Sequence, residues 1–365
     1  MRLCRHVPFV AAVVAALAIG APAAQPAQDG QPCTFPASEI EWLQRALDRW
    51  ERVSREELRT DPASLPWIVL YDAVCVWHLT SAATPGIDSR PIQSRLTFAG
   101  RPVPIRALSH TGWFLLPNGS PLSVEMKAST WLYRNGGEAF FVMAMPSVWQ
   151  SREVSAPTRA EFLLGVFSHE MTHVRLLVSI NRLVRELARK NDLVYPMNDD
   201  VVQTEFQGVA GFESAMNEER DRFYRAALEP NPERRRHLTA RALEAVRRRH
   251  ARYFTGAKAV YAEIEGLFLV LEGVGQWVAY RSSLAPAGGN EAEAIRLVSD
   301  SRRFWSQDEG LALFLLIDAL VPDWRARVFT EIPASPFTLL EEAVQPRSGS
   351  ATKAGRYVRE RTSGM

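Results

Sequence analysis

The sequence has 365 residues, 47% hydrophobic and 23% charged, and this ordinary globular composition excludes fibrous and wholly disordered proteins. Its formal net charge is only +2, and both excess charges, Arg2 and Arg5, lie in an N-terminal segment without acidic residues. The neutral remainder argues against nucleic acid or an anionic membrane as the main partner.

The first 23 residues predict a secretory signal peptide. A short basic start, Met1–His6, precedes the apolar run Val7–Gly20, and Ala21-Pro22-Ala23 fits a small-x-small cleavage site. The apolar run of about 14 residues is shorter than the roughly 20 that a membrane-spanning helix needs. We therefore expect an exported protein, periplasmic or secreted, with no stable membrane span after cleavage. An uncleaved N-terminal anchor is the alternative.

Export changes how the cysteines are interpreted. Cleavage removes Cys4 and leaves Cys33 and Cys75, which can pair in an oxidising compartment. Their disulfide would close a loop of about 40 residues and contribute about 3–4 kcal/mol to stability. The alternative is a pair of free thiols, with Cys75 buried in an apolar strand.

The N-terminal part of the mature chain shows mixed patterns. Residues 24–37, rich in Ala, Gln, Pro and Gly, predict a flexible leader. Apolar residues at helical spacing predict a helix over Ser38–Leu58. Short apolar runs separated by turn signals follow, and the expected strands are Trp67–Val76, Gly112–Leu116, Ser129–Tyr133 and Ala139–Met145. The last two strands would form a hairpin across Asn135-Gly136-Gly137.

After Pro157 the patterns are helical. The expected helices are Thr158–Leu187, Asp199–Leu228, Pro232–Ser283 with a break near Gly256, and Asn290–Leu320. The polar residues 346–365 predict a disordered tail. The expected fold is α+β and mainly α, with an α+β part at residues 38–150 packed on a helical part at residues 151–345.

The helical pattern of Thr158–Leu187 contains the motif HExxH, at His169-Glu170-Met171-Thr172-His173. Two helical positions four residues apart lie about 40° apart around the axis and about 6 Å apart along it. His169 and His173 can therefore share one Zn2+. Glu170 lies beside them, where a general base can take a proton from metal-bound water. Two histidines on a half-exposed helix face are the alternative.

The motif resembles that of the zincin metallopeptidases, over the HExxH helix and one later segment. In one branch, the metzincins, the motif continues as HExxHxxGxxH, and Leu176 and Ser179 exclude that branch here. In the gluzincin branch a downstream helix supplies a glutamate as third ligand. Leu271-Glu272-Gly273-Val274-Gly275-Gln276-Trp277 resembles that segment, although thermolysin-like enzymes have Asn and Asp where this chain has Leu271 and Gln276.

Glu272 is the expected third ligand because it lies in an apolar helical segment, where a buried carboxylate needs a partner. Gly273 and Gly275 would let this helix approach the HExxH helix closely. Four glutamates nearer in sequence remain alternatives: Glu205, Glu213, Glu218 and Glu219.

Further groups could stabilise the transition state or hold the ligands. Tyr261, Glu265 and Gln276 share one helix stripe with Glu272. Tyr280 is another candidate donor to a tetrahedral oxyanion, as is His110. Ala139–Met145 is the expected edge strand for an extended substrate. The arginine runs at 234–236 and 247–249 predict solvated helix faces.

The resemblance implies an exported zinc-dependent metallopeptidase, with the HExxH helix at a cleft between the two parts. Glu170 would deprotonate the zinc-bound water, and a peptide or protein would be the substrate. Two alternatives stay open: a zinc hydrolase with a non-peptide substrate, and a non-catalytic exported binding protein with a structural zinc. The sequence determines neither substrate preference nor oligomeric state.

Overall fold

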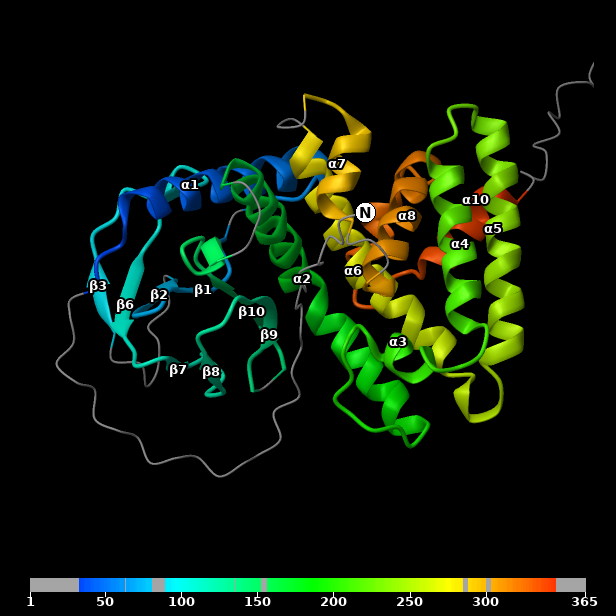
Figure 1. Ribbon diagram of the computed structural model, residues 1–365, viewed down its shortest axis with the longest axis horizontal. Helices are drawn as coiled ribbons and strands as arrows, with labels where there is room; N and C mark the ends of the chain where they lie inside the picture. The colour runs from blue at the N-terminus through cyan, green and yellow to red at the C-terminus, as the bar shows by residue number, and fades with distance from the viewer. Residues whose placement is uncertain are drawn as a thin grey trace, which may run out of the picture.

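The computed structural model describes residues 33–345 except 63, 81–88, 135, 152–155, 285–287 and 300–302. The expected signal peptide, most of the expected leader and the expected tail lie outside these residues. The described chain is α+β and mainly helical, with all its strands in the N-terminal part, as expected (Figure 1). No helix in the described residues is both long and apolar enough to span a bilayer.

A six-stranded sheet forms most of the N-terminal part, in the order β3-β6-β2-β1-β10-β9. Its strands are β1 (Ile68–Tyr71), β2 (Cys75–Leu79), β3 (Arg90–Ile92), β6 (Ile105–Ser109), β9 (Ala128–Leu132) and β10 (Ala139–Ala144). Among the strands that the structure describes, only β1 and β10 pair in parallel. Two small ribbons pair β4 (Thr97–Phe98) with β5 (Arg101–Pro102) and β7 (Trp113–Leu115) with β8 (Pro121–Ser123).

The expected strand Trp67–Val76 is two strands, because a tight turn interrupts it. The Asp72 carboxylate accepts hydrogen bonds from the backbone N–H groups of Val74 and Cys75, both at 2.7 Å, and this local bonding ends β1. The expected hairpin of the last two strands is confirmed, since β9 and β10 pair antiparallel.

The expectation that Ala139–Met145 lies at a sheet edge is wrong. Within this segment β10 has every residue buried and lies between β1 and β9, which suits an almost wholly apolar strand. β9 is the edge strand beside the HExxH helix instead. It carries two adjacent polar residues, Ser129 and Thr130, and both are buried.

The disulfide between Cys33 and Cys75 is confirmed, with the two Cα atoms 5.8 Å apart. It links the start of the described chain to β2. The helix α1 (Ala37–Arg52) follows, extended by one π-helical turn at Val53–Glu57. α1 packs against α2 (Ala156–Lys190), which is the helix that carries the HExxH motif.

Nine α-helices and the short 3-10 helix Gly256–Lys258 make up the described C-terminal part with its connecting loops. After α2 come α3 (Val201–Phe206), α4 (Phe212–Ala227), α5 (Pro232–Tyr253), α6 (Tyr261–Leu284), α7 (Glu291–Val298), α8 (Trp305–Leu320), α9 (Trp324–Val328) and α10 (Pro336–Val344). The expected break near Gly256 is confirmed. Two expected helices are each divided: one at Gly211, whose φ is +79°, and one between α7 and α8.

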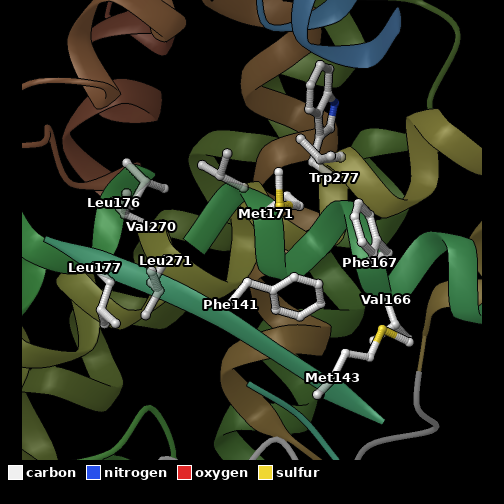
Figure 2. Close-up of a cluster of buried hydrophobic side chains, with 14 of the residues drawn as sticks. Phe141, Met143, Val166, Phe167, Met171, Leu176, Leu177, Val270, Leu271 and Trp277 are labelled. Carbon is white, nitrogen blue, oxygen red and sulfur yellow. The ribbon is translucent and has the colours of Figure 1, made fainter. Parts of the chain in front are cut away.

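The position of α2 fixes the site. α2 runs between the sheet and α6, and α6 lies between α2 and α8 (Figure 1). One apolar cluster joins the sheet to α2 and α6. Figure 2 shows Phe141 and Met143 from β10, Phe167 and Met171 from α2, and Leu271 from α6. Since α2 and α6 share this core, the HExxH helix and the Glu272 helix are held at a fixed separation.

The arginine runs are not wholly solvated. Arg249 is buried at 2% exposure, contrary to expectation, and forms ion pairs with Glu219 at 2.6 Å and Glu265 at 2.9 Å. Its guanidinium also lies over the rings of Phe212 and Phe254. This arginine therefore joins α4, α5 and α6 in the protein interior.

Candidate metal centre

The structure brings His169, His173 and Glu272 together, although Glu272 is carried by a different helix. The two imidazole centroids on α2 are 4.3 Å apart. Both histidines are 6% exposed, and Glu272 on α6 is 1% exposed. The i, i+4 spacing on α2 and the close packing of α6 thus place three metal-ligating side chains at one buried point.

The separations match those of atoms that share one metal ion. His169 Nε2 lies 3.3 Å from Glu272 Oε2, and His173 Nε2 lies 3.4 Å from Glu272 Oε1. Two ligand atoms bound tetrahedrally to zinc at 2.0–2.1 Å are about 3.3–3.4 Å apart. The geometry of the three side chains therefore fits a zinc ion.

The bonding state of these atoms supports the same conclusion. His169 Nε2, His173 Nε2 and Glu272 Oε2 are all buried and have no hydrogen-bond partner. Buried polar atoms in folded proteins are nearly always paired, because an unpaired one loses its hydration without compensation. A cation bound by these three atoms would satisfy all of them at once.

His169 is oriented by the backbone of α6. The Gly275 carbonyl accepts a hydrogen bond from the ring, and since Nε2 is unpartnered, the donor is Nδ1. This bond leaves the Nε2 lone pair free for a metal. A Cβ at Gly275 would lie 2.8 Å from the ring, so the glycine permits the approach, as expected. Gly273 differs, because a Cβ there would meet Phe314 and the Gly310 carbonyl of α8.

Glu170 is held by the edge strand. The Thr130 hydroxyl on β9 lies 2.9 Å from Glu170 Oε2 and donates to it, and that oxygen is also 3.5 Å from His173 Nδ1. The ligand atoms of His169, Glu170 and His173 all lie within 4.8 Å of one another, so these three residues form a group that could bind a metal. Because Glu170 faces Nδ1 of His173 and not the free Nε2, Glu272 has the better position for a third ligand.

The pKa values describe the site without a metal. Burial and the neighbouring His173 lower the pKa of His169 to about 3, which keeps that ring neutral. Burial also lowers the pKa of His173, but the charges of Glu272 and Glu170 outweigh this effect and raise it to about 9. For Glu170, burial raises the pKa, but the contacts with His173 and Thr130 outweigh burial and lower it overall. Glu170 is therefore a carboxylate, the form that accepts protons.

Two further residues lie against Glu272. Burial raises the pKa of Asp199 well above its ordinary value, as does the charge of Glu272, and the carboxyl groups of these two residues share a hydrogen bond. Gln276 donates to Gln307 at 3.0 Å, and Gln307 lies beside Glu272. The contact with Asp199 restricts the orientation of the Glu272 carboxylate.

The four alternative glutamates lie elsewhere. Glu205 and Glu213 are exposed, Glu218 pairs with Arg222, and Glu219 pairs with Arg249. None of them borders the pocket at the histidines. Of the five glutamates considered, only Glu272 reaches both imidazoles.

Of the residues expected to assist the site, Gln276 lies near Glu272, and Glu265, Tyr261 and Tyr280 do not border the pocket at the histidines. Gln276 lies one turn beyond Glu272 and reaches it through Gln307. Glu265 pairs with Arg249 and His250, and Tyr261 packs against Phe206. Tyr280 lies two turns beyond Glu272 on α6, and neither tyrosine borders the pocket. No donor to an oxyanion is therefore identified among Tyr261, Tyr280 and His110.

A pocket opens onto the site between the two parts of the chain. Its walls come from β9, α2, α6 and the loop before α3, and consist of Ser129, Thr130, Glu170, His173, Leu177, Asp199, Leu271 and Glu272. Glu170 and two of the three residues that could hold a metal, His173 and Glu272, thus border this pocket. Thr130 and Asp199 were missed by sequence reasoning, since no motif connects a strand threonine or a loop aspartate to a distant helix.

The chain was also compared with known proteins. No protein-family model, no curated protein and no solved structure matches it.

Proposed function

We propose that this chain is an exported zinc-dependent metallopeptidase. The observation that carries the proposal is the convergence of His169 Nε2 and His173 Nε2 on the Glu272 carboxylate. These three residues are buried, and the separations are 3.3 Å to Oε2 and 3.4 Å to Oε1. Two imidazoles and one carboxylate are the protein ligands of many catalytic zinc sites. The disulfide between Cys33 and Cys75 agrees with export, because disulfides persist in oxidising compartments.

A zinc ion held by these residues supplies a Lewis acid that polarises a carbonyl and acidifies water. Glu170 supplies the base. Its carboxylate borders the pocket, its pKa is lowered, and Thr130 fixes it at 2.9 Å. We infer that Glu170 takes a proton from the attacking water and later gives a proton to the leaving amine.

The edge strand favours an extended peptide as substrate. β9 has a strand neighbour on one side only, and Ser129 and Thr130 of this strand border the pocket. An extended chain added beside β9 would bond to its backbone and would pass Glu170 and His173. This arrangement supports peptide hydrolysis over a purely structural metal site, since a structural site is closed by four protein ligands.

The test combines metal analysis with hydrolysis of a mixed peptide library. The mature chain should bind one zinc ion and cleave peptides, and Glu170→Gln should keep the zinc and lose at least about 100-fold in kcat. Glu186→Gln, on the same helix and away from the pocket, is the matched control. Absence of zinc from the folded protein contradicts the proposal, as does undiminished hydrolysis by Glu170→Gln.

A further inference from the structure

A second pocket adjoins the metal centre and shares Asp199 with the first. It is formed by the loop before α3 together with α3, α4, α6 and α8, and is bordered by Asp199, Asp200, Val202, Gln203, Met216, Glu265, Phe268, Leu269, Trp305 and Ser306. We call it the acidic pocket. We propose that the acidic pocket binds a cationic side chain, lysine or arginine, of a peptide held at the metal centre.

Unpaired acceptor atoms point to a cation as the ligand. Oδ1 of Asp199 and Oδ1 of Asp200 are both buried without a hydrogen-bond partner, and Asp199 is only 6% exposed. Asp200 stands at the N-cap position of α3, where an aspartate normally accepts from the helix backbone, yet its side chain makes no capping bond. Both acceptors therefore remain available to a donor that enters the pocket.

The charges in the acidic pocket are only partly balanced. Glu265 is paired with Arg249 and His250. In the described part of the chain neither Asp199 nor Asp200 forms an ion pair, although Arg303 lies near enough to influence Asp200. A cationic ligand would supply the positive charge and the hydrogen-bond donors that these two aspartates lack.

The apolar walls suit the stem of such a side chain. Met216, Phe268, Leu269 and Trp305 border the same space as the aspartates. Lysine and arginine bury their methylene groups against apolar surfaces and direct their charged ends to acceptors. A small metal cation would leave these walls without a function.

The pocket is also placed to receive part of a substrate. Asp199 borders both pockets and contacts Glu272. Glu265, Phe268 and Glu272 lie on one face of α6, and the two glutamates are about 10 Å apart along the axis. One side chain of a peptide at the histidines would therefore reach the acidic pocket past Asp199, which the two pockets share.

The inference rests on the proposed function for its ligand, so the experiment separates binding from hydrolysis. The zinc-loaded Glu170→Gln protein is titrated calorimetrically with blocked pentapeptides that carry arginine or its neutral isostere citrulline at each position in turn. Lysine and norleucine form a second pair. At one position the cationic peptide should bind about tenfold more tightly or better, the effect of one charged hydrogen bond.

The same titrations on variants locate the effect. Asp200→Asn should remove the preference for arginine over citrulline, whereas the exposed control Asp61→Asn should keep it. Equal affinities at every position, no binding by either series, or a preference that survives Asp200→Asn in a folded protein each overturns the inference. If the preference is found but the parent protein hydrolyses no peptide, the proposed function fails and this inference stands.

Discussion

Nε2 of His169 lies 3.3 Å from Oε2 of Glu272, and neither atom has a hydrogen-bond partner. The two residues are on different helices, α2 and α6, which pack directly against each other. Two unpaired buried atoms at this separation are stable together only if something positive lies between them. The packing of two apolar helices thereby brings together side chains that could hold a metal ion.

Loss of the carboxylate should release the metal. Glu272→Gln keeps the shape of the side chain but removes the charge and the anionic oxygen, so zinc affinity should fall by at least about 100-fold, more than loss of a supporting contact usually causes. Competition with a chromogenic chelator measures the affinity. Glu263→Gln, exposed on the same helix, is the control and should bind zinc normally. Unchanged affinity in Glu272→Gln would show that another group is the ligand.

Two glycines on α6 should have separable effects. In Gly275→Ala the new methyl group would lie 2.8 Å from the His169 ring, so the ring must move and zinc affinity should fall about tenfold or more. In Gly273→Ala the methyl group meets Phe314 and the Gly310 carbonyl, so stability should fall by about 1–3 kcal/mol. Chelator competition and denaturant unfolding, run on both variants, distinguish the effects. The reverse pattern would contradict this assignment of the two contacts.

Thr130 should support the reaction without binding the metal. Thr130→Val removes the hydroxyl that donates to Glu170 at 2.9 Å, so kcat should fall by about tenfold while zinc content stays the same. Steady-state kinetics on a peptide cleaved by the parent protein measures the change. Thr97→Val, at an exposed position of β4, should leave kcat unaltered. An unaltered kcat in Thr130→Val would show that the Thr130 hydroxyl does not support Glu170 in the reaction.

The metal-free protein should lose stability as the pH rises. The pKa of His173 is raised from 6.5 to about 9 in the folded protein, so its protonated form stabilises the fold fully below about pH 6.5. This contribution, on the order of 3 kcal/mol, disappears between about pH 6.5 and pH 9. Urea unfolding of chelator-treated protein across this range measures it. His173→Gln should reduce the dependence without abolishing it, because burial raises the pKa of Asp200 to about 8 and gives a loss of the same sign. A parent protein with equal stability at both ends of the range contradicts the prediction.

The disulfide should stabilise the N-terminal part. Replacing Cys33 and Cys75 together by serine opens a loop of 42 residues, which should lower the free energy of unfolding by about 3–4 kcal/mol. Denaturant unfolding of the zinc-loaded proteins gives the difference. The parent protein with its disulfide reduced and both cysteines alkylated serves as a comparison. Equal stability of the two proteins would contradict the expected loop-closure effect.

Local patterns predicted much of the fold. Helical spacing predicted α1 and α2, and Gly256 marked the break between α5 and α6. The Asn135-Gly136-Gly137 signal predicted the β9–β10 hairpin. Sheet order was not accessible in this way, because the neighbours of β10 are fixed by tertiary packing and not by its own residues. That is why the edge strand was assigned to the wrong member of the hairpin.

The site was predictable to the extent that its residues follow helical spacing. His169, Glu170 and His173 share one turn of α2, and the apolar surroundings of Glu272 indicated a buried carboxylate in need of a partner. Thr130 and Asp199 reach the site only through the fold. The arginine run at 247–249 was interpreted as one solvated face, although helical spacing places Arg249 on the apolar stripe with Ala242 and Val246.

X-ray absorption at the zinc edge tests the central claim most directly. The mature protein, supplied with zinc and freed of excess metal, should contain one zinc ion per chain with two imidazoles and a carboxylate oxygen at about 2.0–2.1 Å. The His169→Ala and Glu272→Gln proteins should lose that signal. A folded parent protein that retains no zinc, or zinc whose spectrum shows no imidazole scattering, would contradict the account.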